Sequence, residues 1–237
     1  MYQNIFLHIP HHSAYIPKQL GDHNSPALRN LRANAFYLID YHTLPLFSPT
    51  NPNLLIHILC ARDNRMLVDM ERLPNDPLES SGFGIVSQWA IDWLGEDFKK
   101  VAINQYIAYH EYAAQCLNAL KNPILIDCHS FSSNPTPLCP IPQDVDICIG
   151  WNEDDTTPNR MLLGLIAAYF MDCGYSIGIN KPFSNSKTFH RANGYHSLMI
   201  EINKRCYMDE ETLEKSSNFN NLHNQLQKLY RIILDYR

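Results

Sequence analysis

The chain of 237 residues has a formal net charge of −5, and 45% of its residues are hydrophobic. This hydrophobic content is enough for a sizeable core and excludes a disordered chain. The negative charge argues against a nucleic-acid-binding protein, which would carry a basic stripe. No stretch approaches the roughly 18 apolar residues that a membrane span needs, so we expect neither a nucleic acid nor a membrane as partner. The length fits one large domain, which we expect to span residues 1–237.

Seven cysteines are scattered along the chain, and none forms a Cys-x-x-Cys pair. This spacing argues against a zinc ribbon or a thioredoxin-type site and favours reduced, mostly buried thiols. The N-terminal residues carry no basic leader, and histidines interrupt the first apolar stretch, so a secretory signal is not expected. Together these features predict a cytoplasmic protein.

Apolar segments predict strands along the whole chain, and several are continuous runs that suit a sheet covered on both faces. The expected strands are 4–9, 54–60, 65–70, 123–128, 145–150, 175–179 and 196–203. Helical periodicity and end signals predict helices at 26–47 (interrupted near Pro45), at 97–121, at 157–173 after a Thr157-Pro158 cap, and at 209–236 opened by Asp209. The stretch 130–144 holds four prolines and is expected to be a loop. Strands that alternate with helices predict an α/β fold.

Polar side chains end two of the apolar runs. His11 follows the run 5–9, and Asp127 and His129 follow the run 124–126. In open α/β sheets, ligands bind at the carboxyl ends of the strands. Cys128 lies between Asp127 and His129, which makes a nucleophilic role conceivable, but strand alternation points it to the opposite face, where a packed thiol is the alternative.

A third polar pair, Asp40 and His42, lies at the edge of an otherwise apolar segment. Catalytic zinc sites use three protein ligands, drawn from His nitrogen and carboxylate oxygen, together with water. One ligand from each segment predicts a zinc site made of His11, Asp40 and His129. The alternative for any of the 11 histidines is a structural or surface role.

Three arginines, Arg62, Arg65 and Arg72, surround the short apolar run 66–68. A planar guanidinium group matches a carboxylate, so one of them is a candidate clamp for an acidic substrate. The alternative is pairing with neighbouring acidic residues of the same segment. Glu201 interrupts the apolar strand 196–203, and a carboxylate there is costly to bury unless it is paired or catalytic. It is a candidate general base, or else a partner of Arg205 or Arg191.

These segments together resemble the N-formylglutamate amidohydrolase family from residue 5 to about residue 211. The resemblance rests on Pro10-His11-x-Ser13-x-Tyr15-Ile16-Pro17, Asp40-Tyr41-His42, Arg65-x-x-Val68-Asp69-x-x-Arg72, Asp127-x-His129-Ser130-Phe131 and Glu201-Ile202 followed by Tyr207-Met208-Asp209-Glu210.

The resemblance implies the fold of the related zinc carboxypeptidases and aspartoacylases, a single-domain mixed sheet of the eight-stranded type flanked by helices. It implies hydrolysis of the amide of an N-formyl or N-acyl acidic amino acid, a small-molecule substrate, with one zinc or another divalent ion per chain. By position, the metal ligands are His11, Asp40 and His129, the general base is Glu201, and the group that polarises the carbonyl is Arg65 or Arg62. Arg72 matches the substrate-carboxylate clamp, and Arg62 and Tyr207 are further expected substrate contacts.

Two departures from the family pattern bear on the substrate. Glu71 stands where the family usually has Asn, and the segment 182–187 replaces a Lys-Gly-Gly-Tyr segment. A larger N-acyl amino acid or a peptide is therefore an alternative substrate. A binding protein that kept the fold and lost catalysis is an alternative of another class.

Overall fold

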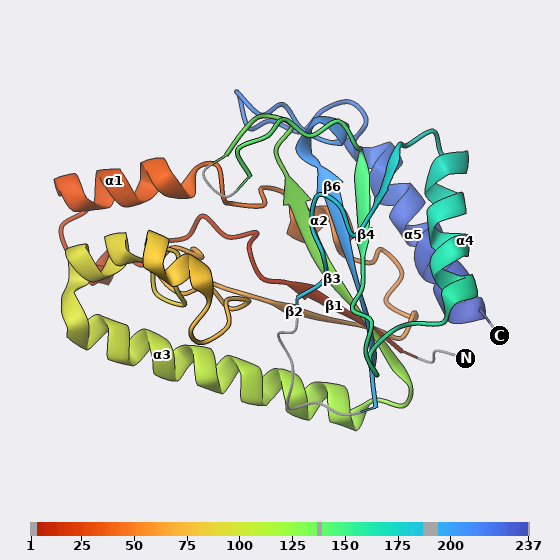
Figure 1. Ribbon diagram of the computed structural model, residues 1–237, viewed down its shortest axis with the longest axis horizontal. Coiled ribbons are helices and arrows are strands. Elements are labelled where there is room, and N and C mark those ends of the chain that lie inside the picture. The colour runs from red at the N-terminus through yellow and green to blue at the C-terminus, as the bar shows by residue number, and fades with distance from the viewer. Residues whose placement is uncertain (1–3, 137–138, 187–193, 237) are drawn as a thin grey trace.

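A six-stranded sheet forms the centre of the computed structural model, which describes residues 4–136, 139–186 and 194–236 (Figure 1). The order across the sheet is β2-β1-β3-β6-β4-β5. All neighbouring strands run parallel except β4 and β6, which are antiparallel, so the sheet is mixed as expected. Within the described residues it has six strands rather than eight. The strands are β1 Asn4–Ile9, β2 Ile56–Cys60, β3 Pro123–Phe131, β4 Ile147–Gly150, β5 Ile177–Ile179 and β6 His196–Asn203.

The expected strand at 65–70 is wrong, because this segment forms a buried turn. The backbone oxygen of Asn64 accepts hydrogen bonds from the N–H groups of Leu67 (2.8 Å) and Val68 (3.3 Å), and its side chain accepts one from Met66 (2.9 Å). These three apolar residues are each 2% exposed. Burial therefore explains the apolar run without a strand. The loop expected at 130–144 begins later than residue 130, because β3 continues through Phe131. Residues 137–138 of this loop lie outside the described part of the chain.

The helices are α1 Pro26–Ala35, α2 Thr43–Phe47, α3 Gln88–Ala119, α4 Arg160–Asp172 and α5 Phe219–Asp235. Short 3-10 turns lie at Lys18–Leu20, Pro77–Ser81 and Lys204–Cys206. Helix α3 begins earlier than expected, since Ser87 caps its N-terminus by accepting a hydrogen bond from the N–H of Ala90, and the helix is kinked at Gly95 with φ 82°. Asn159, not Thr157, caps α4 by accepting from the N–H of Met161.

The expected helix start at Asp209 is wrong. The Asp209 carboxylate accepts hydrogen bonds from the N–H groups of Glu211 and Thr212, at 2.9 and 2.8 Å, as a helix cap would. Leu213 then adopts φ 59°, a left-handed conformation that a helix cannot continue through. The capping signal closes a turn there, and α5 begins only at Phe219.

Helices cover both faces of the sheet. Ile5, Leu7 and Ile9 of β1 face a core that includes α4 and α5, whereas Phe6 packs with residues of α3 on the other face. Figure 1 shows α4 and α5 on one side and α3 along the opposite side. This two-sided burial explains why the strands read as continuous apolar runs. No helix in the described ranges is long and apolar enough to cross a membrane.

Candidate active site

The site lies at the carboxyl ends of the central parallel strands. His129 is near the end of β3 and is paired in register with Glu201 of β6. His11 lies two residues after the end of β1, and its backbone oxygen accepts a hydrogen bond from the N–H of Asp40 at 2.9 Å. That bond brings the segment after α1 to the same edge of the sheet. Four residues distant in sequence thus meet where α/β sheets bind ligands.

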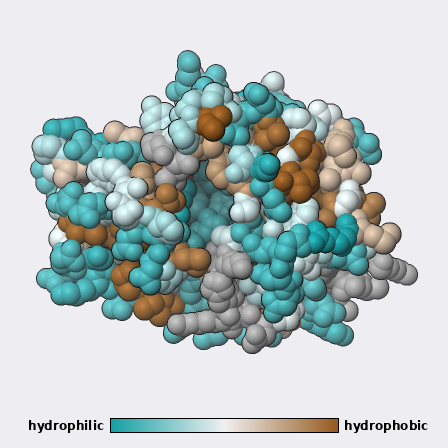
Figure 2. Space-filling view, in the orientation of Figure 1, coloured by the Kyte–Doolittle hydropathy of each residue, from teal (hydrophilic) through white to brown (hydrophobic). Residues whose placement is uncertain are grey.

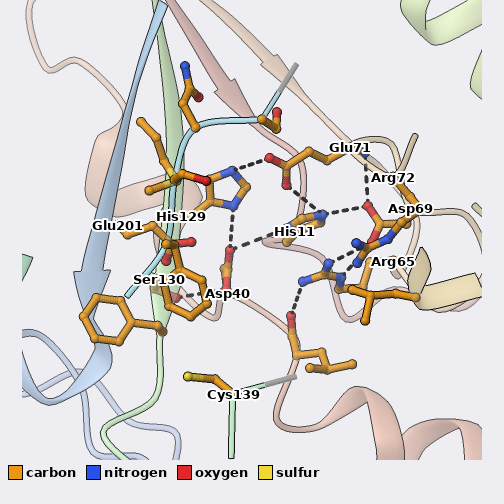
Figure 3. Close-up of a pocket in the computed structure, with 18 of the residues that line it drawn as sticks. His11, Asp40, Arg65, Asp69, Glu71, Arg72, His129, Ser130, Cys139 and Glu201 are labelled. Atoms are coloured by element: carbon orange, nitrogen blue, oxygen red, sulfur yellow. Dashed lines mark hydrogen bonds and ion pairs between the residues drawn. The ribbon is translucent and has the colours of Figure 1, made fainter. Parts of the chain in front are cut away.

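A cavity of about 620 Å³ opens at this edge. In the space-filling view it is a hollow with hydrophilic residues at its floor (Figure 2). Its lining includes all three expected metal ligands and Glu201, Arg65 and Arg72 (Figure 3).

The three expected ligands converge on one point. Within the described residues, one ligand atom from each of His11, Asp40 and His129 lies within 4.8 Å of the others, and all three side chains are buried. Asp40 Oδ2 is 3.3 Å from Nδ1 of His129 and 3.8 Å from Nδ1 of His11. These separations suit atoms that share one ion, each at about 2.0–2.2 Å from it.

The far nitrogen of each histidine faces a second carboxylate. Nε2 of His11 is 2.8 Å from Asp69 Oδ1, and Nε2 of His129 is 3.0 Å from Asp127 Oδ1. Metal-ligating histidines commonly donate their other N–H to a carboxylate, which fixes the tautomer and the ring orientation. Asp127 and His129 share one face of β3, which the spacing of two residues predicts. The role of Asp69 was not foreseen, because no local pattern places it behind His11.

The protonation states of His11 and His129 indicate whether the three side chains suit a bound cation. Burial and the neighbouring Arg65 lower the pKa of His11, so its imidazole is neutral. Since a carboxylate only accepts, Nε2 carries the hydrogen toward Asp69 and Nδ1 turns a lone pair toward Asp40. Nδ1 of His11 and the carboxylate of Asp40 are therefore two acceptors that face each other, and a cation between them would stabilise this arrangement. Burial opposes the charge of His129, but Glu71 and Asp127 outweigh it and raise its pKa well above the usual range. The cluster thus attracts positive charge, and its donors fit a divalent metal.

Glu201 is 9% exposed and reaches the cavity from β6. Burial raises its pKa to about 8, with Asp40 and Glu71 adding to the rise and His129 opposing it. Its Oε2 has no hydrogen-bond partner among the described residues. The suggested partner Arg205 instead pairs with Asp146 at 3.0 Å, and Arg191 lies outside the described residues. Glu201 is therefore a buried carboxyl group with a raised pKa beside the candidate metal ligands, as a general base requires.

The arginines and Tyr207 differ in their placement. Arg65 makes two hydrogen bonds to Asp69 Oδ2, at 2.7 and 3.2 Å, and one to the Leu38 backbone oxygen at 3.1 Å. Arg72 also lines the cavity. The side chain of Arg62 is 72% exposed, lies over the ring of Tyr15 and does not line the cavity. Tyr207 is fully buried, donates its hydroxyl to the Tyr41 backbone oxygen at 2.9 Å and does not line the cavity either.

Cys128 is also fully buried and faces the core that contains α4 and α5. Burial raises the pKa of its thiol well above the usual range. A neutral thiol on the face opposite to Asp127 and His129 is a packed side chain, not a nucleophile of this site.

The mixed α/β layers and this site define the class: a hydrolytic enzyme with a buried carboxylate beside a set of metal-type ligands. A family model described as N-formylglutamate amidohydrolase matches residues 3–208. The chain belongs to this family and is a hydrolytic enzyme that acts on an amide.

Solved structures agree with the fold. An N-formylglutamate amidohydrolase from Ralstonia eutropha is similar with a TM-score of 0.68 at 20% identity, over 99% of this chain and 94% of that one. A gene product from Agrobacterium tumefaciens is similar with a TM-score of 0.66 at 18% identity, over 98% and 92% of the two chains. No curated protein matches the chain.

Proposed function

We propose that the protein is a metal-dependent amidohydrolase that cleaves the amide of an N-formyl or N-acyl amino acid, with N-formylglutamate as the reference substrate of its family. The observation that carries the proposal is the convergence of His11, Asp40 and His129 on one point beside Glu201. The ligand set would hold one zinc ion, or another divalent ion, per chain. Such an ion supplies a Lewis acid that acidifies water and polarises the amide carbonyl.

The side chains of the chain itself supply the proton transfers and the orientation. Glu201 takes a proton from the attacking water and passes it to the departing nitrogen. Burial raises the pKa of Glu201 to about 8, so its carboxyl group can both accept a proton from water and release one to the nitrogen. Arg65, held rigid by Asp69 and the Leu38 backbone, stabilises negative charge on the carbonyl oxygen. Arg72, on the cavity wall, binds the substrate carboxylate. Neither Arg62 nor Tyr207 has a place in this scheme.

A larger acyl group is a second candidate, which the cavity volume of about 620 Å³ favours. Cavities of this size hold ligands much larger than a formyl group with one amino acid. A comparison of formyl, acetyl and longer acyl derivatives of the same amino acid separates the two candidates. Equal or lower kcat/KM for every longer group would rule out the second.

We also propose that the chain forms one domain, acts on a small-molecule substrate and resides in the cytoplasm. The cytoplasmic location is supported by the seven cysteines, which are all free, as thiols are in that reducing compartment.

Metal analysis combined with hydrolysis assays tests the proposed function. Protein purified without added metal is expected to hold about one divalent ion per chain and to hydrolyse N-formylglutamate. Glu201→Gln keeps the size of the side chain but removes the base, so it should retain the metal and lose at least about 10²-fold in kcat. The matched control is Glu96→Gln on the exposed side of α3, which should leave both unchanged. Near-normal turnover of Glu201→Gln would remove Glu201 from the mechanism, and a metal-free inactive wild type would support a binding protein instead.

A further inference from the structure

Glu71 is a cavity-lining carboxylate that the proposed reaction does not use. Its backbone N–H donates to Asp69 Oδ1 at 3.0 Å, which fixes its position on the wall. Its Oε1 is 3.4 Å from Nε2 of His129, and its Oε2 is 3.5 Å from Nε2 of His11 (Figure 3). The side chain is 17% exposed. Glu71 therefore stands between the outer edges of both imidazoles and the cavity.

Both imidazole nitrogens already have nearer acceptors. Nε2 of His11 is 2.8 Å from Asp69, and Nε2 of His129 is 3.0 Å from Asp127. One N–H makes one good hydrogen bond, so the more distant Glu71 is a surplus acceptor at both. In the described parts of the chain, the two oxygens of Glu71 make only long contacts of 3.4 and 3.5 Å to these imidazoles. A partly buried carboxylate in this state gains from any donor that enters the cavity.

The adjacent Arg72 is complementary to Glu71. Its terminal nitrogens are 3.6 Å from Asp69 and 3.5 Å from Asp76, both long contacts, and its Nε has no hydrogen-bond partner within the described ranges. Because these two contacts are long and Nε is buried, it is the terminal nitrogens of Arg72 that remain available as donors for one substrate carboxylate. The wall offers donors at Arg72 and acceptors at Glu71, next to each other in the chain.

The charges of the lining disfavour a second substrate carboxylate. Among the residues that the structure describes, five carboxylates and two guanidinium groups line the cavity. When Glu201 is ionised for catalysis, a divalent cation at the histidines still leaves one of these described carboxylates without a matching positive charge. A dicarboxylate would place a negative charge against an excess of negative charge, at a cost that the low dielectric of a buried site increases. The groups counted are Asp40, Asp69, Glu71, Asp76 and Glu201, with Arg65 and Arg72.

We infer that Glu71 sets the substrate side-chain specificity of this enzyme: the preferred N-acyl amino acid has one carboxylate, held by Arg72, and a side chain that ends in a hydrogen-bond donor facing Glu71. A carboxamide or a cationic group has this chemistry, and the carboxylate of glutamate does not. The inference rests on the proposed amide hydrolysis at this site.

N-formylglutamine and N-formylglutamate test the inference, because they differ only in an amide in place of a carboxylate. The wild type should show at least about tenfold higher kcat/KM for N-formylglutamine, the value of one hydrogen bond to a charged group. Glu71→Gln is isosteric and neutral, and should bring the ratio of the two kcat/KM values close to one or invert it. Because both substrates meet the same variant, any loss of metal or of overall rate cancels in the ratio. Glu96→Gln should keep the wild-type ratio. N-formyllysine shows whether a cation serves as well as a carboxamide.

Calorimetry on metal-free protein, where no hydrolysis occurs, gives the same comparison as two binding constants. A wild type that prefers N-formylglutamate in both measurements would overturn the inference and leave the proposed function standing. An unchanged ratio in Glu71→Gln would also overturn it, by removing Glu71 as the determinant. If metal-loaded protein hydrolyses neither compound nor their longer N-acyl counterparts, the proposed function fails, while the binding preference still decides the role of Glu71.

Discussion

Glu201→Gln should change how the stability of the metal-free protein depends on pH. Burial, helped by Asp40 and Glu71, raises the pKa of Glu201 from an ordinary 4.5 to about 8. Below pH 4.5 the folded and the unfolded chain are both protonated at this position. Between 4.5 and 8 the unfolded chain releases the proton that the folded chain keeps, so the free energy of unfolding falls as pH rises. Above pH 8 both states are ionised and the contribution is constant.

The size of this effect follows from the shift. One retained proton gives a slope of about 1.4 kcal/mol per pH unit, and the full range amounts to a loss on the order of 5 kcal/mol. Glutamine does not titrate, so Glu201→Gln lacks this loss. The variant should therefore gain stability relative to wild type as pH rises from about 5 to about 8, although it loses the catalytic base.

Urea unfolding of both metal-free proteins between pH 5 and pH 9 measures the difference. Subtraction of the two curves isolates the contribution of Glu201 together with its coupling to His129, Asp40 and Glu71, whereas groups that do not interact with Glu201 cancel. Glu96→Gln, which removes an exposed carboxyl group on α3, should give a curve parallel to wild type. If the curve of Glu201→Gln also runs parallel to wild type up to pH 8, the buried carboxyl group is ionised throughout and the reasoning is refuted.

Three further substitutions test other parts of the structure. Asp69→Asn removes the negative charge of the group that accepts from Nε2 of His11 and should weaken metal affinity about 10- to 100-fold in a competition titration with a chelator; unchanged affinity would mean that the charge of Asp69 does not support metal binding by His11. Arg72→Ala removes the carboxylate clamp and should mainly raise KM for N-formylglutamate, so an unchanged KM would place the clamp elsewhere. Leu226→Ala on α5 empties a fully buried site and should lower the free energy of unfolding by about 2–5 kcal/mol, whereas Lys228→Ala on the exposed side of the same helix should change it little.

The parts of the fold that follow from local pattern were predicted well. Six of the seven expected strands form, because a run of apolar residues buried on both faces has few alternatives to a central strand. The turn at 65–70 has the same apolar composition and is equally buried, so composition could not separate it from a strand. Asp209 shows a similar limit. Its carboxylate makes the hydrogen bonds of a cap, but Leu213, which no sequence signal announces as left-handed, turns the chain back so that Met208 pairs with Lys215 in an antiparallel bridge.

The candidate site was predictable where its residues end strands. His11 and His129 stand at the ends of apolar runs, and Glu201 interrupts one, so each is conspicuous in the sequence. The structure brings these three to one cavity together with Asp40. Asp69 and the bridging position of Glu71 depend on how the segment after β2 folds back over the sheet, and no periodicity encodes that path. A hydrogen bond across more than fifty residues, as between His11 and Asp69, becomes visible only in three dimensions.

The position of β6 between β3 and β4 has a consequence for how the protein is made. The three candidate metal ligands all precede residue 132 in the chain. Strands β3 and β4 both pair with β6, which ends only at Asn203. A growing chain that has not yet reached residue 203 therefore exposes the unpaired edges of two strands, which invite pairing with other chains. During synthesis the ligands for an ion can assemble first, and the glutamate that would use it arrives with the strand that closes the sheet.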